Sequence, residues 1–157
     1  MPWEPTLDIM RRTIANLEFV ERNARPGGPF EVTQLLNSFL GALAHPWERY
    51  RSDFHNIPFT ADDGWPRLPP ALQTDKVPDS LTEALRLLRN GIAHGNIDFL
   101  QGPDGSIRAI RIQNYDRGRR TWGTILTVSD LRLFLYRFVE FAECLGRDAQ
   151  AAQMRSA

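Results

Sequence analysis

The chain has 157 residues, 42% of them hydrophobic and 24% charged, and its formal net charge is zero. This composition is ordinary for a globular domain with its own core, and a neutral chain has no overall field that attracts nucleic acid or anionic lipid. Nucleic-acid contacts must therefore come from a local patch. Lys76 is the only lysine among the 19 basic residues, so 18 are arginine. This bias fits phosphate binding, but a coding bias toward arginine explains it more simply.

Cys144 is the only cysteine, so no disulfide can form within the chain, as expected for a reducing compartment. No apolar run approaches the roughly 20 residues that span a bilayer. The first ten residues also lack the basic segment and apolar stretch of a signal peptide. We therefore expect a cytoplasmic protein without a membrane partner, and a packed, unreactive Cys144 within an apolar helix.

Two helices are predicted in the first third of the chain. Residues 6–24 carry apolar side chains at the i, i+3, i+7 spacing of a helix, with Thr6 as the N-cap, and "RPGGP" ends the helix. Residues 30–54 are apolar on more than one face, which predicts a central helix that Pro46 ends or kinks.

A proline-rich stretch, residues 56–78, predicts a long connection that Trp65 and Leu68 hold against the core. A third helix follows over residues 79–94. Ser80 and Glu83 have the spacing of a capping box, and Gly95 sits where a left-handed C-cap is expected.

The apolar spacing then changes to that of strands. Two turn signals, "GPDGS" and "YDRGRR", predict an antiparallel hairpin or a three-stranded sheet. The last helix is expected over residues 129–146, with Ser129 or Asp130 as its cap and Gly146 as its end; residues 147–157 continue it or fray. The predicted fold is mainly α: an antiparallel bundle of four main helices with a small β insertion before the last helix. We expect one domain over residues 1–157, with its core at about 6–146.

The third helix carries the most informative polar residues. With a step of about 100° per residue, one face is apolar and consists of Leu81, Leu85, Leu88 and Ile92. The opposite face holds Glu83, Arg86, Asn90 and His94. Asn90 and His94 are four residues apart and can touch. Arg89 lies about 100° from Asn90 and must swing in to join that face. For Arg89 and His94 to cooperate, either the helix is disturbed near Gly91 or a second copy completes the site.

These residue types suit RNA cleavage. Histidine exchanges protons near neutral pH, and arginine can clamp a phosphate with two hydrogen bonds. The 2′-hydroxyl of RNA is itself a nucleophile, so the protein need supply only positioning and electrostatic stabilisation. The alternative is an ordinary helix end, where arginine and histidine complement the negative end of the helix dipole.

The stretch Arg89-Asn90-Gly91-Ile92-Ala93-His94 resembles the R-x4-6-H motif of the HEPN superfamily, with the polar residue that family has after the arginine. Together with "LLNSFLGALAHPWER" upstream and "RTWGTILTVSDLRLFLYRF" downstream, it resembles stand-alone, plasmid-type HEPN proteins of bacteria over residues 8–146. The resemblance implies a helical bundle that forms two-fold dimers, with the motifs of both copies meeting in a cleft.

The resemblance further implies a metal-independent endoribonuclease without cofactors, often a toxin or defence protein, in which an antitoxin or another protein can be a partner. Arg89 would bind the scissile phosphate, His94 would be the general acid/base, and Asn90 would support it. A non-catalytic HEPN module that binds a nucleotide or a protein is the alternative, because membership does not prove activity.

Other polar residues give weaker signals. Residues that could add RNA contacts are Arg86, Asn96, Arg117, Arg119 and Arg120. The last three flank a turn near Tyr115 and Trp122, which could stack on bases, although a solvated hairpin tip is the simpler explanation. His45 and His55 lack neighbours at metal-ligand spacing, so no metal site is expected.

Overall fold

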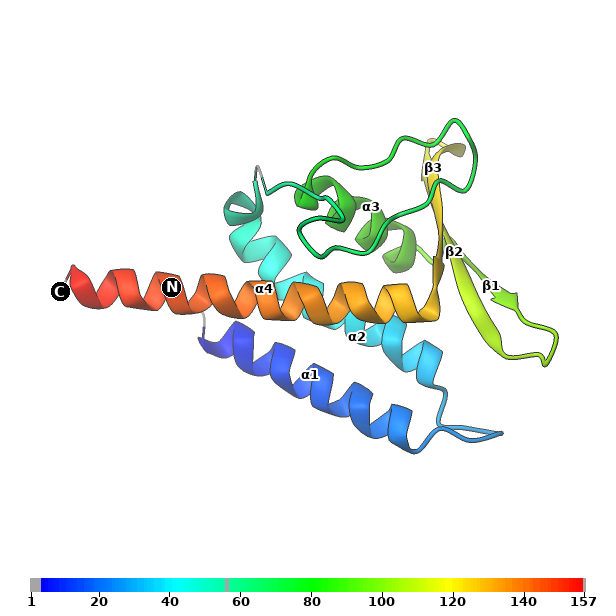
Figure 1. Ribbon diagram of the computed structural model, residues 1–157, viewed down its shortest axis with the longest axis horizontal. Helices are drawn as coiled ribbons and strands as arrows, with labels where there is room; N and C mark the ends of the chain where they lie inside the picture. The colour runs from blue at the N-terminus through cyan, green and yellow to red at the C-terminus, as the bar shows by residue number, and fades with distance from the viewer. Residues whose placement is uncertain (1–3, 56, 157) are drawn as a thin grey trace. The chain divides into compact units, whose positions relative to one another are not determined.

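The computed structural model describes residues 4–55 and 57–156 and shows four α-helices with a three-stranded antiparallel sheet before the last helix (Figure 1). The helices are α1 (Glu4–Arg22), α2 (Glu31–Tyr50), α3 (Leu81–Ala93) and α4 (Val128–Arg155). A short 3-10 helix, η1 (Arg51–Phe54), follows α2. The strands are β1 (Ile97–Gln101), β2 (Ile107–Asp116) and β3 (Arg119–Thr127), in the order β1-β2-β3. The predicted fold class is confirmed.

The chain forms two compact units: a helical unit of residues up to 49 and from 135 onward, and a motif unit of residues 50–134. The expectation of one domain over the whole chain stays a prediction. Among the described residues, none of the helices combines the length and the apolar character needed to cross a membrane.

The helical unit joins α1 to the later part of α4 in antiparallel fashion. Arg11 pairs with Glu143 at 2.9 Å, and about two helical turns further along α1 the hydroxyl of Tyr136 donates to Glu18 at 3.2 Å. Residue numbers rise along α1 as they fall along α4, so the helices run in opposite directions. Fully buried apolar side chains fill this unit, among them Leu7, Met10, Leu17, Phe39, Leu43 and Phe138.

Helix ends account for most of the differences from the sequence expectations. Thr6 lies inside α1, because the helix already begins at Glu4. Helix α4 is capped by Thr127, whose hydroxyl accepts from the N–H of Asp130 at 3.0 Å, rather than by Ser129 or Asp130. Gly146 does not end α4, which continues to Arg155 because good helix formers follow it. Pro46 lies inside α2 without ending it.

Other local expectations are confirmed. Ser80 caps α3 by accepting from the N–H of Glu83 at 3.2 Å, and Gly95 has φ +68°. Leu81, Leu85 and Leu88 are fully buried. Cys144, in contrast, is exposed on α4, where Arg147 donates to its sulfur at 3.3 Å, so the expectation of a packed thiol is wrong.

In the motif unit, α3 lies against β2 (Figure 1). The contact includes Gly91. A Cβ at this position would collide with the Ile112 side chain and approach the Gln113 carbonyl oxygen to 2.9 Å. Hydrogen bonds hold the same contact: the side chain of Asn114 donates to the Leu87 carbonyl at 2.8 Å, and the N–H of Gln113 donates to the Asn96 carbonyl at 2.9 Å. Gly91 is therefore a packing requirement within the motif.

The long connection before α3 is held against the outer edge of β3. Thr124 donates its hydroxyl to the Pro69 carbonyl at 2.7 Å, and the N–H of Ala71 donates to the Gly123 carbonyl at 3.0 Å. Trp65 and Leu68 are buried, as expected, and Trp65 packs on Phe134 with ring centroids 5.3 Å apart. This connection is thus part of the folded unit rather than a loose loop.

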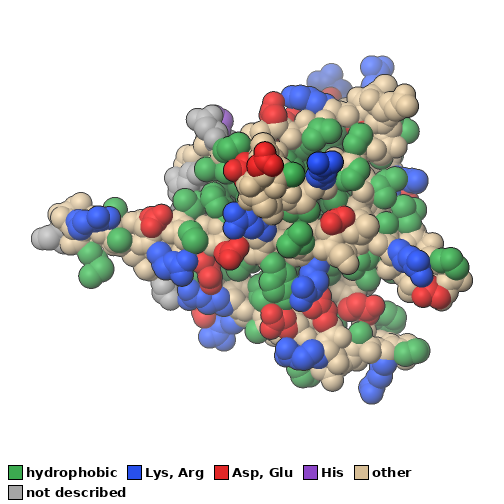
Figure 2. All heavy atoms as spheres, viewed as in Figure 1, with side chains coloured by type: hydrophobic (Ala, Val, Ile, Leu, Met, Phe, Trp, Pro, Cys, Tyr) green, Lys and Arg blue, Asp and Glu red, His purple; other side chains and the backbone are tan. Residues whose placement is uncertain are grey.

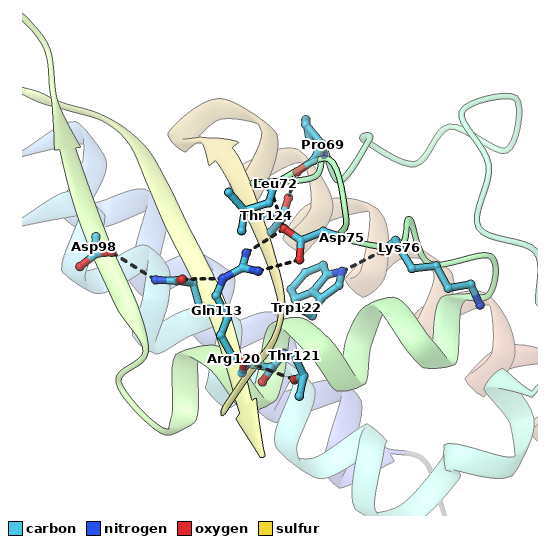
Figure 3. Close-up of polar contacts among 11 residues, drawn as sticks. Pro69, Leu72, Asp75, Lys76, Asp98, Gln113, Arg120, Thr121, Trp122 and Thr124 are labelled. Carbon is cyan, nitrogen blue, oxygen red and sulfur yellow. Dashed lines mark hydrogen bonds and ion pairs between the residues drawn. The ribbon is translucent and has the colours of Figure 1, made fainter. Parts of the chain in front are cut away.

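One ion pair fixes the end of this connection (Figure 3). Arg120 on β3 binds both carboxylate oxygens of Asp75, at 2.9 and 2.7 Å, and the Asp75 side chain is only 2% exposed. The third guanidinium nitrogen, Nε, donates to Gln113 at 2.9 Å. Hydrogen bonds from Arg120, and from the N–H of Leu72, hold the pKa of Asp75 below its ordinary value against the opposing effect of burial.

We predict that Gly91→Ala lowers the free energy of unfolding by about 1–3 kcal/mol, because overpacking at β2 outweighs the better helix propensity of alanine. The matched control is Gly41→Ala in α2, where the new Cβ would meet only Thr13 at 3.9 Å and the variant should be at least as stable as wild type. Urea unfolding measures both. Equal stabilisation by the two substitutions would show that α3 does not pack tightly on β2.

We predict that Asp75→Asn lowers the free energy of unfolding by about 2 kcal/mol at neutral pH. The pKa of Asp75 is lower in the folded protein than in the unfolded chain. Its contribution to the free energy of unfolding is therefore complete above the pKa of the unfolded chain, and it is lost as the pH falls through the pKa of the folded protein. The difference between wild type and Asp75→Asn should therefore shrink below about pH 4. Asp79→Asn is the control, since Asp79 is exposed and lies 3.8 Å from Lys76. A pH-independent difference would contradict this role for Asp75.

Candidate active site

The predicted motif lies at the C-terminal end of α3, and the helix stays regular through Gly91 to Ala93. Of the two geometric alternatives, a disturbed helix near Gly91 is therefore not observed. Arg89 reaches its neighbour with its long side chain instead: Nη1 donates to Oδ1 of Asn90 at 3.2 Å. Both side chains are partly buried.

His94 is the C-cap residue of α3 and is exposed to solvent. Asn90 and His94 are joined by a backbone hydrogen bond, in which the N–H of His94 donates to the Asn90 carbonyl at 3.1 Å. Gly95 then turns the chain, and Asn96 closes the helix by donating its N–H to the Gly91 carbonyl at 2.9 Å. The imidazole is thus placed at an open helix end, on the same helix as an arginine that is held by the Asn90 amide.

A polar groove of about 510 Å³ begins at Asn90 and is formed by three segments of the motif unit. The polar face of α3 contributes Glu83, Arg86 and Asn90. The hairpin of β2 and β3 contributes Asn114, Tyr115, Asp116, Thr121 and Trp122, and the long connection contributes Thr74 and Lys76. The groove therefore adjoins the motif through Asn90, while His94 lies outside its lining.

The groove wall is fixed by contacts that the sequence did not reveal (Figure 3). Trp122 is only 4% exposed, and its indole N–H donates to the Lys76 carbonyl at 2.9 Å. The ion pair of Asp75 with Arg120 holds the neighbouring part of the connection. A sequence signal existed for Asn114 alone: the strand alternation of Ile110, Ile112 and Asn114 places it on the buried face.

The arginines at the hairpin differ in their surroundings. Arg117 and Gly118 form the two-residue turn between β2 and β3, both with positive φ, +47° and +76°. Arg117 and Arg119 are exposed, whereas the guanidinium of Arg120 is occupied by Asp75 and Gln113. On the face drawn in Figure 2, basic and acidic side chains are interspersed rather than gathered into one basic patch.

The residues that line the apolar cavity, and the remaining histidines, lie apart from the motif in the chain. A mainly apolar cavity of about 600 Å³ lies along the long connection and is lined by residues such as Phe59, Trp65 and Val77, with none of the predicted site residues. Among the described residues, no three histidine, cysteine, aspartate or glutamate side chains are grouped so that they could hold a metal ion. The side chain of His45 lies outside the described residues, and His55 is exposed.

The geometry is thus an arginine and an exposed histidine at one helix end, next to a polar groove. In comparisons with known proteins, no curated protein and no solved structure matches the chain. A family model does match: "HEPN pEK499 p136", a plasmid-type HEPN family, over residues 2–146. Because this match covers nearly the whole chain, including the motif on α3 and the sheet that packs on it, the protein belongs to the HEPN pEK499 p136 family.

Proposed function

We propose that this protein is a homodimeric, metal-independent endoribonuclease whose active site contains Arg89, Asn90 and His94. The observation that carries the proposal is the placement of an exposed imidazole and a partly buried arginine at the same end of α3. Membership of a HEPN family supports it, because HEPN domains are often ribonucleases.

In the proposed reaction, the 2′-oxygen of RNA attacks the adjacent phosphorus and the bond to the 5′-oxygen breaks. The products are a 2′,3′-cyclic phosphate and a free 5′-hydroxyl. His94 takes the proton of the 2′-hydroxyl or gives one to the leaving oxygen, and Arg89 neutralises charge that develops on the phosphate oxygens. Asn90 holds the guanidinium through its 3.2 Å hydrogen bond and so restricts the positions that Arg89 can adopt.

A second copy of the chain is part of this proposal. His94 and Arg89 diverge on a regular helix, so one copy offers them in different directions. A two-fold axis near the helix ends would let the arginine of one copy act with the histidine of the other. We further propose a toxin or defence role, with an antitoxin or other protein as partner, on the strength of the family alone.

The second candidate is a non-catalytic HEPN module that binds a nucleotide or a protein. The polar groove next to Asn90 favours it, because the groove offers hydrogen-bonding side chains without needing any cleavage chemistry. This candidate expects a nucleotide-dependent rise in melting temperature and no cleavage by pure wild-type protein.

We predict that His94→Ala lowers the rate of cleavage of single-stranded RNA in EDTA by about 10²–10⁴-fold, the usual contribution of a general acid or base. Fold and oligomeric state should be unchanged, since the imidazole is exposed. His55→Ala, which removes another exposed histidine of the motif unit, is the matched control and should cleave like wild type. Equal rates for wild type and His94→Ala would overturn the proposal.

We predict that mixing two inactive variants, Arg89→Ala and His94→Ala, restores part of the activity if each site combines an arginine from one copy with a histidine from the other. At full exchange about half of the dimers are mixed, and each mixed dimer carries one intact pair, as expected for a symmetric interface. The recovered activity should therefore approach a quarter of the wild-type rate. Sedimentation measures the dimer in parallel, and a mixture that stays inactive despite exchange would reject a shared site.

A further inference from the structure

The groove next to the motif has balanced charge. Lys76 and Arg86 line it together with Glu83 and Asp116, so two positive and two negative side chains face the same space. A pocket for a phosphate would instead carry a net positive charge, since phosphate binding depends on neutralisation by lysine and arginine. The groove therefore suits an uncharged polar group with both hydrogen-bond donors and acceptors.

An aromatic ring is available at the rim of the groove. Tyr115 is 49% exposed, so its ring is accessible, whereas Trp122 is 4% exposed and its N–H is already bonded to the Lys76 carbonyl. Bases of single-stranded RNA that are not paired stack on such exposed aromatic rings. The volume of about 510 Å³ also lies within the usual range of small-ligand pockets. These features together fit one unstacked base.

Glu83 gives the groove a basis for selecting among bases. It lies two turns before Asn90 on the same face of α3, and its side chain is 29% exposed. Its carboxylate can only accept hydrogen bonds, and guanine is the base whose Watson–Crick edge presents two adjacent donors, at N1 and N2. Lys76 approaches the same carboxylate only to 4.0 Å, so this weak ion pair leaves its oxygens able to accept from a base.

We propose that this groove binds one base of the RNA substrate next to the cleavage site, with the base stacked on Tyr115 and guanine selected by Glu83. The proposal rests on the proposed RNA cleavage and adds a specificity pocket to it. Asn90 connects the two, because it lines the groove and also binds Arg89 at 3.2 Å. Exposed arginines outside the groove, Arg117 and Arg119, remain for the phosphate backbone.

The test uses fluorescent 2′-O-methyl hexamers of uridine in which one internal position is G, A, C or U. The methyl group blocks attack by the 2′-oxygen, so binding to full-length protein is measured without cleavage, by anisotropy in EDTA. Wild type should bind the G hexamer at least about fivefold more tightly than the others, which is the size of one good bidentate contact. Glu83→Gln should abolish most of this preference, and Tyr115→Ala should weaken all four hexamers about tenfold.

Matched controls separate the groove from general surface effects. Phe99→Ala removes an aromatic ring of similar exposure, 44%, from the same sheet, and Glu140→Gln removes an exposed carboxylate outside the groove. Both should bind like wild type, and urea unfolding checks that every variant is folded. Equal binding of the four hexamers by wild type, or a preference for G that survives Glu83→Gln, would overturn the proposal.

Cleavage of the same hexamers with ordinary ribose distinguishes this proposal from the one on which it rests. Cleavage by wild type without any dependence on the variable base or on Glu83 would overturn the base pocket and leave the ribonuclease standing. A preference for G that depends on Glu83, in a protein that never cleaves, would overturn the ribonuclease and leave a base-binding module.

Discussion

The contact of α3 with β2 at Gly91 is the constraint on which the rest of the site depends. At this point the helix has no side chain, so Ile112 and the Gln113 backbone occupy the space that a Cβ would need. The two residues before Gly91 and the three after it form the motif. Any shift of the sheet away from the helix would therefore move Asn114 from Leu87 and open one wall of the groove next to Asn90.

The arginines of the hairpin between β2 and β3 differ in role: one forms structural contacts and two are exposed to solvent. Arg120 is committed to Asp75 and Gln113, and through them it ties β3 to β2 and to the long connection. Gln113 extends this chain of contacts to Asp98 on β1 at 3.4 Å, so polar side chains cross the entire sheet (Figure 3). Arg117 and Arg119 have no such burial. The many arginines in the sequence thus have very different roles, and the role of each can be assigned only from its surroundings in the folded protein.

At the C-terminal end of α3, the side chain of His94 is exposed to solvent, whereas the backbone at Gly91 is packed closely against β2. In the proposed ribonuclease, the proton-transferring group must reach its substrate, whereas the backbone that carries it must be held in place for efficient chemistry. The C-cap position provides this combination, because the main chain of residue 94 is bonded to Asn90 while its side chain projects into solvent. Arg89 gains its own restraint from the Asn90 side chain.

The amino-acid sequence was enough to predict the helical character of the chain, a small antiparallel β insertion before the last helix, the apolar face of α3 and the motif from Arg89 to His94. These features depend on local periodicity and on residues close together in the chain. The helix ends were predicted less well. Thr127 caps α4 in place of Ser129, because a neighbouring hydroxyl can accept the same hydrogen bond, and the helix formers after Gly146 outweigh one glycine. Three other features become visible in the folded structure alone: Gly91 packs against β2, Arg120 is bound to Asp75, and Lys76 and Tyr115 share a groove with Asn90. These pairs are separated by 14 to 45 positions in the chain, and no local spacing rule specifies which distant side chains a folded chain brings together.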